Sequence, residues 1–424
     1  MDRTAAGGRS GAQVKNTDVG RAAFALFAVW GLTRLALLLF VFKVFVFPGP
    51  DVTSDVSFIY HGWYEVLREG TFPQEDVTWQ YPPAAALAIL SPALLPFLEY
   101  AQAFFVLAFL ADFAVLALLM SAGQRPGRTL RGAWVWVAGV PLLGPTVYAR
   151  YDLMVTAVAV AALLAGARRP RLMGALAGFG AMLKVWPALL LVGCVKRRAW
   201  GAAAATAAGL AVLFSLVMPG AFAFLTFQRD RGTEVESLGS LVFHVARHHG
   251  WEGQVLLNYG SVEFLGPYVD MVSTAALALT GMAMGWLLLW RLAAVRFTAT
   301  TLADAAFTAV LLFTATSRVI SPQYMVWLVG LAAVCLGYRS SRMRLPGLLV
   351  VAASLVTVLE FPVWFAHVVA SDTLGVGLLV LRNGMLVAAG FLAARELWRA
   401  TAARTPPAPL PGQTAAAKGT PVSS

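Results

Sequence analysis

The sequence predicts an all-α membrane protein, a polytopic bundle of about twelve transmembrane helices. Apolar residues make up 59% of its 424 residues, and the mean hydropathy is +0.72. Only 12% of the residues are charged, and apolar runs long enough to cross a bilayer recur along the chain. These observations exclude a soluble enzyme and predict an integral membrane protein.

The two ends of the chain differ in composition from the rest. Residues 1–20 are small and polar, and we expect a disordered cytoplasmic N-terminus. The apolar run Arg21–Phe47 is too long for the core of a signal peptide, so it is the first predicted span of a transmembrane domain over residues 21–399. Residues 400–424 are rich in Pro, Ala and Thr, which predicts a disordered cytoplasmic tail.

Basic residues predict the orientation of the chain. They are concentrated in short segments, which the positive-inside rule assigns to the cytoplasm. These segments are Arg3–Arg21, Arg125–Arg131, Arg168–Arg171, Lys196–Arg198, Arg291–Arg296, Arg339–Arg344 and Arg395–Arg404. The chain must leave and return between successive segments, which gives twelve spans with both termini inside, in the plasma (inner) membrane. Because the net charge of +11 is spread over these segments, no nucleic-acid partner is predicted.

An acidic loop, residues 48–83, follows the first span and holds six carboxylates. Asp51 and Asp55 precede an aromatic run, which is typical of amphipathic helices at a membrane interface. Alternatively, Asp55 caps a helix, a role that is compatible with accepting a proton. Residues 82–98 are apolar but broken by prolines, so we expect them to be half-inserted. A second polar loop covers residues 220–266.

Five charged residues are predicted to share the external side with the acidic loop. The turns that carry Asp152, Lys184, Arg231, Arg318 and Asp372 all emerge there once the basic segments are placed inside. Charged groups near a bilayer are costly and tend to mark function. We therefore expect a functional site at the external face. The segment 229–237 is dense in both signs, a pattern more typical of a solvated loop.

Several charges have competing interpretations. Arg150 and Asp152 are close enough in sequence to form an ion pair with each other at a turn. Lys184 lies within the apolar run 172–195, so it either extends to the surface or binds an anion, and we favour the anion.

Two more charges lie within predicted spans. Arg34 is midway along the first span and Asp112 midway along the second. A charge inside a bilayer needs a partner, so we predict that these two residues form a structural ion pair.

Four local patterns carry a resemblance to a known family. They are Asp55…Tyr60…Gly70…Pro73…Tyr81-Pro82-Pro83, Arg150-Tyr151-Asp152-Leu153, Lys184-Val185-Trp186-Pro187, and Arg231…Glu236-Ser237 with Ser317-Arg318…Ser321-Pro322-Gln323-Tyr324. In their order and spacing, over residues 21–395, the chain resembles the GT-C superfamily of integral-membrane glycosyltransferases. Within it, the chain resembles glycosyltransferase family 87, the polyprenyl-phosphate-mannose-dependent mannosyltransferases.

The resemblance implies an active site on the external face, with an aspartate of the acidic loop as catalytic base. By position this residue is Asp55, with Asp51 as the alternative. The implied donor is a sugar, usually mannose, joined through one phosphate to a polyprenol, and the acceptor is a hydroxyl of a lipid-linked or cell-wall glycan. Relatives often have a histidine where this chain has Gln323. The linkage and the oligomeric state stay open.

The chemistry assigns roles to the remaining residues. Direct attack by an acceptor hydroxyl inverts the anomeric centre and needs one base, whereas the leaving phosphate needs cations. The candidate phosphate-binding cations are Lys184, Arg231 and Arg318. The candidate substrate-binding residues are Tyr60, Trp79, Tyr81, Arg150, Asp152, Glu236 and Gln323. We expect no cofactor and no metal ion. A lipid or sugar transporter or flippase is the alternative function, although polar groups would then be expected near the midplane.

Overall fold

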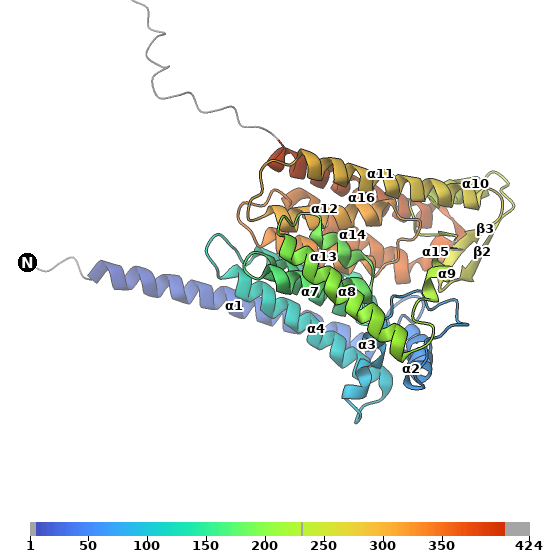
Figure 1. The fold of residues 1–424 in the computed structure, drawn as a ribbon, viewed down its shortest axis with the longest axis horizontal. Helices are drawn as coiled ribbons and strands as arrows, with labels where there is room; N and C mark the ends of the chain where they lie inside the picture. The colour runs from blue at the N-terminus through green and yellow to red at the C-terminus, as the bar shows by residue number, and fades with distance from the viewer. Residues whose placement is uncertain (1–5, 230–231, 403–424) are drawn as a thin grey trace, which may run out of the picture.

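The computed structural model describes residues 6–229 and 232–402. This part of the chain is mostly helical, with one small sheet (Figure 1). Six of its helices are long and apolar enough to cross a membrane. They are α1 (Ala6–Val41), α4 (Tyr100–Gly123), α8 (Arg197–Val217), α11 (Val269–Ala293), α14 (Arg344–Val358) and α16 (Thr373–Thr401).

The spanning part of α1 starts at Gly20, and that of α14 extends through the following π-helical turn η5 (Leu359–Val363). The α1 helix itself begins at Ala6, inside the segment predicted to be disordered.

Shorter helices fill the rest of the bundle. They are η1 (Asp55–Tyr60), α2 (His61–Arg68), α3 (Ala85–Leu90), η2 (Ser91–Leu94), α5 (Arg131–Gly139), η3 (Pro141–Val147), α6 (Asp152–Gly166), α7 (Pro170–Leu183), η4 (Trp186–Leu191), α9 (Phe224–Arg229), α10 (Leu241–Arg247), α12 (Thr301–Thr316), α13 (Tyr324–Leu336) and α15 (Phe365–Ala370).

The predicted twelve spans are therefore not confirmed. Many apolar runs are divided into short helices, as where prolines separate α5 from η3. A helix of 13 residues such as α13 is about 20 Å long, shorter than the roughly 30 Å hydrocarbon core of a bilayer.

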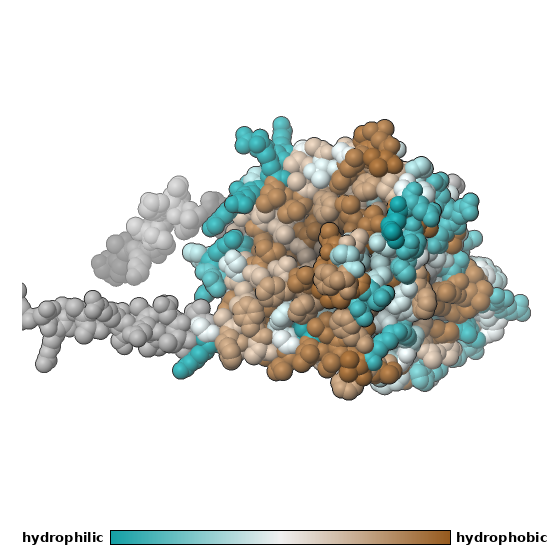
Figure 2. Space-filling model, turned by 90° about the horizontal axis from the view of Figure 1, so that it is seen from below, coloured by the Kyte–Doolittle hydropathy of each residue, from teal (hydrophilic) through white to brown (hydrophobic). Residues whose placement is uncertain are grey.

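The polar loops gather at one end of the molecule. Figure 1 places α2, α9, α15 and the strands β2 and β3 at the right-hand end, and the start of α1 at the opposite end. The end of α16 lies on the same side as the start of α1. In Figure 2, hydrophobic residues cover the middle of the face and hydrophilic residues gather toward its two ends. This distribution is typical of a protein that sits in a bilayer.

The second polar loop contains a small sheet, which corrects the all-α prediction. Its strands are β1 (Thr233–Glu234), β2 (Gln254–Asn258) and β3 (Ser261–Leu265), in the order β1-β3-β2 with both pairs antiparallel. The hairpin between β2 and β3 turns at Tyr259 and Gly260, whose φ angles are 48° and 77°. Two successive positive φ angles are typical of the tight turn that matches the twist of paired strands.

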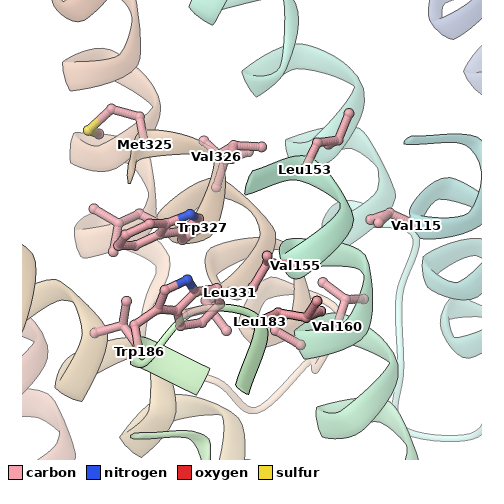
Figure 3. Packing of buried hydrophobic residues seen from close by; sticks show 14 of the residues in the cluster. Val115, Leu153, Val155, Val160, Leu183, Trp186, Met325, Val326, Trp327 and Leu331 are labelled. Atoms are coloured by element: carbon pink, nitrogen blue, oxygen red, sulfur yellow. The ribbon is translucent and has the colours of Figure 1, made fainter. Parts of the chain in front are cut away.

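The helix α13 lies at the centre of the bundle. Every residue from Met325 to Leu336 is buried, and the helix contacts α5, α6, α12 and α14. Figure 3 shows Trp327 of α13 beside Trp186 of η4, and their rings stack with centroids 5.1 Å apart. A helix enclosed on all sides by other helices does not need to be long enough to reach both membrane surfaces.

Helices α7 and α8 approach each other closely through two glycines. A Cβ atom built on Gly174 would lie 1.9 Å from the carbonyl oxygen of Ala199, and one on Gly178 would lie 2.3 Å from that of Ala203. Small residues four positions apart are a common means of close packing between helices in membranes. The two backbones can therefore meet only because both positions lack a side chain.

The predicted ion pair between Arg34 and Asp112 is confirmed. Arg34 Nε lies 2.7 Å from Asp112 Oδ2, and both side chains are completely buried. The carboxylate of Asp112 also accepts hydrogen bonds from Trp136 Nε1, at 2.6 Å, and from the Tyr148 hydroxyl, at 2.7 Å. The pair thus ties α1 and α4 to α5 and η3, which stabilises a buried charge that would otherwise be costly.

Candidate active site

A cavity of about 800 Å³ opens between the acidic loop, the β2–β3 hairpin and the turn before α13. Nine of the predicted site residues line it, although they come from distant parts of the chain. They are Asp51, Asp55, Tyr60, Tyr81, Arg150, Lys184, Glu236, Arg318 and Gln323. Trp79 and Asp152 are buried outside this lining, and Arg231 lies outside the described residues.

Asp55 pairs with Arg150 at the edge of the cavity. Arg150 Nη2 lies 2.5 Å from Asp55 Oδ2, and 33% of the Asp55 side chain is exposed. Among the described residues, the other carboxylate oxygen, Oδ1, has no hydrogen-bond partner. The N-cap of η1 is Ser54 and makes no side-chain cap, so the capping role considered for Asp55 is not observed. Asp55 therefore has one oxygen held by a cation and one available to a ligand.

Asp51 is in a different environment. Its Oδ2 lies 2.8 Å from Lys43 Nζ, and its Oδ1 accepts hydrogen bonds from the backbone N–H and the hydroxyl of Thr53. Partial burial would raise the pKa of Asp51, but the hydrogen bonds from Lys43 and Thr53 outweigh it and lower the pKa below its ordinary value. Asp51 is thus the weaker candidate for a base, because both of its oxygens are already occupied.

Asp152 and Arg150 do not form the ion pair that their spacing suggested. Asp152 instead pairs with Lys184, with Nζ 2.6 Å from Oδ1, and the same oxygen accepts a hydrogen bond from Trp327 Nε1 at 2.7 Å. Asp152 is the first residue of α6 and is only 1% exposed. Arg150 and Asp152 are therefore close in sequence but pair with different residues, Arg150 with Asp55 and Asp152 with Lys184.

Lys184 lies in an aromatic environment at the end of α7. Its backbone is extended, with φ −159° and ψ 130°, where the helix stops. Its ammonium lies 5.0 to 5.5 Å from the ring centroids of Tyr81, Tyr151, Tyr324 and Trp327. Such rings attract a cation through their negative faces. The side chain is 11% exposed and does not extend to the surface, so the ammonium is held at the cavity wall.

Glu234 was not identified from the sequence, yet it fixes one wall of the cavity. Its carboxylate accepts hydrogen bonds from Ile320 N at 2.6 Å and from Ser321 Oγ at 2.9 Å. Its own backbone N–H donates to the carbonyl of Arg318 at 3.1 Å. Glu234 is 2% exposed and Glu236 is 4% exposed. The segment that looked like a solvated loop is therefore buried in part, and the apolar Val235 between the two glutamates is the local hint of this burial.

Two contacts position Arg318: its carbonyl accepts the backbone N–H of Glu234, and its side chain contacts α11. Its Nη1 donates to Ser273 Oγ at 3.1 Å. Both Arg318 and Gln323 line the cavity, on either side of the turn at Ser321-Pro322. The turn thus brings a cation and an amide to the same cavity as the acidic loop, although the two segments are far apart in sequence.

Aromatic rings form the floor of the acidic loop. Tyr60 stacks on Trp63 with ring centroids 5.3 Å apart, and Trp79 meets both Trp63 and Tyr81 edge-on. Trp79 is completely buried, so it supports the lining rings from behind. Rings at a cavity wall can stack on the apolar faces of a sugar, whereas the hydroxyl of Tyr81 can hydrogen-bond to it.

The cavity also reaches the apolar surface of the protein. Leu225, Leu257 and Leu277 line it and are 59%, 77% and 52% exposed. They come from α9, β2 and α11. One side of the cavity is therefore polar and charged, and another is continuous with a surface suited to hydrocarbon.

The fold and the cavity define a helical membrane protein with a charged site at one end of the bundle. The sequence model of glycosyltransferase family 87 matches residues 79–322, and the chain belongs to this family. It is a glycosyltransferase. Of the predicted site, Arg150, Lys184 and Arg318 lie inside the matched segment, and Asp55 precedes it. Neither the curated proteins nor the solved structures contain a match.

The expectation that no metal ion takes part stays a prediction. Within residues 6–229 and 232–402, no group of three or more His, Cys, Asp or Glu side chains has a geometry that would hold a metal ion.

Proposed function

We propose that the protein transfers a sugar from a polyprenyl phosphate to a hydroxyl of a lipid-linked or cell-wall glycan, and that this sugar is mannose. The reaction takes place on the external face of the plasma membrane, with both termini in the cytoplasm, and Asp55 is the general base. The observation that supports this best is the carboxylate of Asp55, held by Arg150 through Oδ2 with Oδ1 facing no partner among the described residues.

The proposed reaction is a direct displacement. The acceptor oxygen forms a bond to the anomeric carbon while the bond from that carbon to the phosphate oxygen breaks, and the phosphate leaves with the electron pair. Asp55 Oδ1 takes the hydroxyl proton. A positioned base of this kind contributes roughly a hundredfold to ten-thousandfold in rate. Attack from the side opposite the phosphate inverts the configuration of the sugar.

The leaving phosphate requires positive charge rather than a proton. Lys184 and Arg318 line the same cavity as Asp55, and their charges would stabilise the phosphate as it leaves. Arg231, also assigned to this role, lies outside the described residues. Lys184 also pairs with Asp152, so its positive charge would be shared between that carboxylate and the phosphate.

The apolar side of the cavity favours a lipid-linked donor over a nucleotide sugar. Leu225, Leu257 and Leu277 would receive the first isoprene units while the remaining chain stays in the bilayer. A polyprenyl phosphate then presents its sugar at the depth of the charged residues. Tyr60, Tyr81 and Gln323 line the cavity and would orient that sugar.

A transporter remains the alternative, but the positions of the charges count against it. Transport sites usually lie near the midplane between repeated halves of the protein. The charges that line this cavity gather at one end of the bundle, where the polar loops lie. Membership of a glycosyltransferase family also favours the enzyme.

Reconstituted protein tests the proposal. The protein is reconstituted in proteoliposomes with a polyprenyl phosphate mannose and a mixture of glycolipids as acceptors. We expect a new glycosidic bond of inverted configuration, measured by NMR of the product. Asp55→Asn should lose roughly a hundredfold or more of this turnover while donor binding persists. Asp51→Asn is the matched control and should stay active. Movement of donor across the bilayer without bond formation would instead support the transporter.

A further inference from the structure

Three glutamates and one arginine lie close together beside the cavity, and two of them, Glu234 and Glu236, line it. Glu234 belongs to β1, Glu236 follows it, Glu360 belongs to η5 and Arg382 to α16. None is more than 4% exposed. Three acidic side chains thus lie near the guanidinium of Arg382 in a place that water hardly reaches. Such a cluster is costly unless hydrogen bonds or protons compensate the excess negative charge.

The hydrogen bonds show which carboxylates are compensated. Arg382 donates to both oxygens of Glu360, from Nε at 3.1 Å and from Nη2. Glu234 receives the backbone N–H of Ile320 and the hydroxyl of Ser321. Each of these two carboxylates therefore accepts hydrogen bonds at both of its oxygens.

Glu236 differs from both. Arg382 contacts its backbone carbonyl, at 2.8 Å, and not its carboxylate. Its Oε1 is buried without a hydrogen-bond partner in the described part of the chain, and the residue lines the cavity. Burial, reinforced by the negative charges of Glu360 and Glu234 and by a side-chain hydrogen bond with Glu360, and opposed by Arg382, raises the pKa of Glu236 well above its ordinary value. In this environment the protonated form of the Glu236 carboxyl group is favoured over the ionised form.

We propose that Glu236 acts as a neutral carboxylic acid that donates a hydrogen bond to the phosphate of the lipid-linked donor. This inference rests on the proposed function. The phosphodiester carries a negative charge, so an ionised Glu236 would repel it, whereas the protonated acid can turn its O–H from Glu360 to the phosphate. Glu236 is two residues from Glu234, whose backbone N–H is bonded to the carbonyl of Arg318. The acid and the candidate phosphate-binding cation therefore lie in adjoining segments of one wall.

Equilibrium binding of a synthetic donor as a function of pH tests this role. The probe is the mannosyl phosphate diester of farnesol, and every protein carries Asp55→Asn to prevent turnover. With Glu236 intact, the dissociation constant should be constant at low pH and then rise by about tenfold per pH unit once the acid ionises. Glu236→Gln should bind several-fold more weakly at low pH, because an amide is the poorer donor, with no such rise. Glu236→Ala should bind at least about tenfold more weakly than the parent at low pH, with a dissociation constant that does not change with pH.

Glu252→Gln is the matched control, because this glutamate is exposed in the same loop. It should keep the pH dependence of the parent. Thermal unfolding in detergent verifies that each variant is folded. A folded Glu236→Gln protein that keeps the rise at high pH would overturn the inference, as would a parent protein without any rise. A protein with Asp55 intact that transfers no sugar from any polyprenyl phosphate would instead refute the proposed function.

Discussion

Arg150 Nη2 lies 2.5 Å from Asp55 Oδ2, and this contact joins the acidic loop to the turn that precedes α6. The Nη1 atom of Arg150 donates to the carbonyls of Val52 and Ala149, at 3.2 and 2.8 Å. The guanidinium is therefore held both by the acidic loop, through Val52, and by its own turn, through Ala149. Because it holds only one oxygen of Asp55, it can orient the carboxylate without blocking it. Arg150 is thus a positioning residue for the proposed base.

Arg150→Met is predicted to lower kcat by roughly a hundredfold and to change the donor KM much less. A methionine fills similar space but releases the carboxylate, and misplacement of a catalytic group by about 1 Å can cost a hundredfold in rate. Arg150→Lys should recover part of the loss. Arg68→Met is the control, since Arg68 is exposed and pairs with Glu65 at the surface. Initial rates over a range of donor concentrations measure both parameters, and an unchanged kcat in Arg150→Met would contradict the positioning role.

Lys184→Met is predicted to destabilise the protein by about 3–5 kcal/mol, because it leaves the carboxylate of Asp152 buried without a cation. The double variant Lys184→Met, Asp152→Asn should regain most of this loss in thermal unfolding. Donor binding by the double variant then separates two roles for Lys184. Weak binding would support contact with the phosphate, whereas full binding would show that Lys184 serves only to neutralise Asp152.

The contrast between two ion pairs shows what the sequence could predict. Arg34 and Asp112 were paired correctly because each is an isolated charge inside a predicted span, and a charge there must find a partner. Asp152 had a nearer candidate in Arg150, so spacing suggested the wrong pair. Which way a side chain points at the start of a helix depends on the packing of other helices, and the sequence does not show this.

The number of spans could not be predicted for a related reason. The length of an apolar run predicts a membrane span only if the helix faces lipid, and α13 is buried on all sides. In the second polar loop, β1 joins the sheet through long-range pairing with β3, which leaves no local pattern, whereas the β2–β3 hairpin has a local turn signal at Tyr259-Gly260. By contrast, Gly174 and Gly178 are four positions apart, and such spacing is a local signal of close helix packing.

The ion pair of Arg34 and Asp112 is predicted to be essential for stability. Arg34→Met alone should cost about 3–5 kcal/mol, because the carboxylate of Asp112 stays buried. The double variant Arg34→Met, Asp112→Leu should recover only part of the loss, since Trp136 Nε1 and the Tyr148 hydroxyl then lose their acceptor. Melting temperatures in detergent test this, and strictly additive losses would contradict a direct pairing.

Gly178→Leu is predicted to separate α7 from α8. A side chain at this position would meet the carbonyl of Ala203, a backbone atom that cannot rotate away. We expect low yields of monodisperse protein and a loss of stability of at least about 1–3 kcal/mol. Gly209→Leu on α8 is the matched control, because a Cβ there meets nothing within 4 Å. Equal behaviour of the two variants in size-exclusion chromatography would contradict the close packing.

His244 is predicted to make the second polar loop sensitive to acid. Its Nε2 donates to the carbonyl of Val235 at 2.8 Å, so its Nδ1 is the acceptor for the Ser371 hydroxyl, at 2.7 Å. Burial, with the charge of Arg247 nearby, lowers the pKa of His244 from 6.5 to about 4. The folded protein therefore binds fewer protons than the unfolded chain between these two values, and its stability should fall as the pH falls through this window.

The measurement is the melting temperature of the protein in detergent as the pH is lowered from 7 through the interval between 6.5 and about 4. His244→Gln removes the titrating ring, so its melting temperature should fall less steeply than that of the parent, whatever its starting value. His249→Gln is the control, because His249 is exposed in the same loop. If parent and His244→Gln decline in parallel, the acid sensitivity arises elsewhere, and the neutral His244 bridge between Val235 and Ser371 does not limit the stability of this end of the bundle.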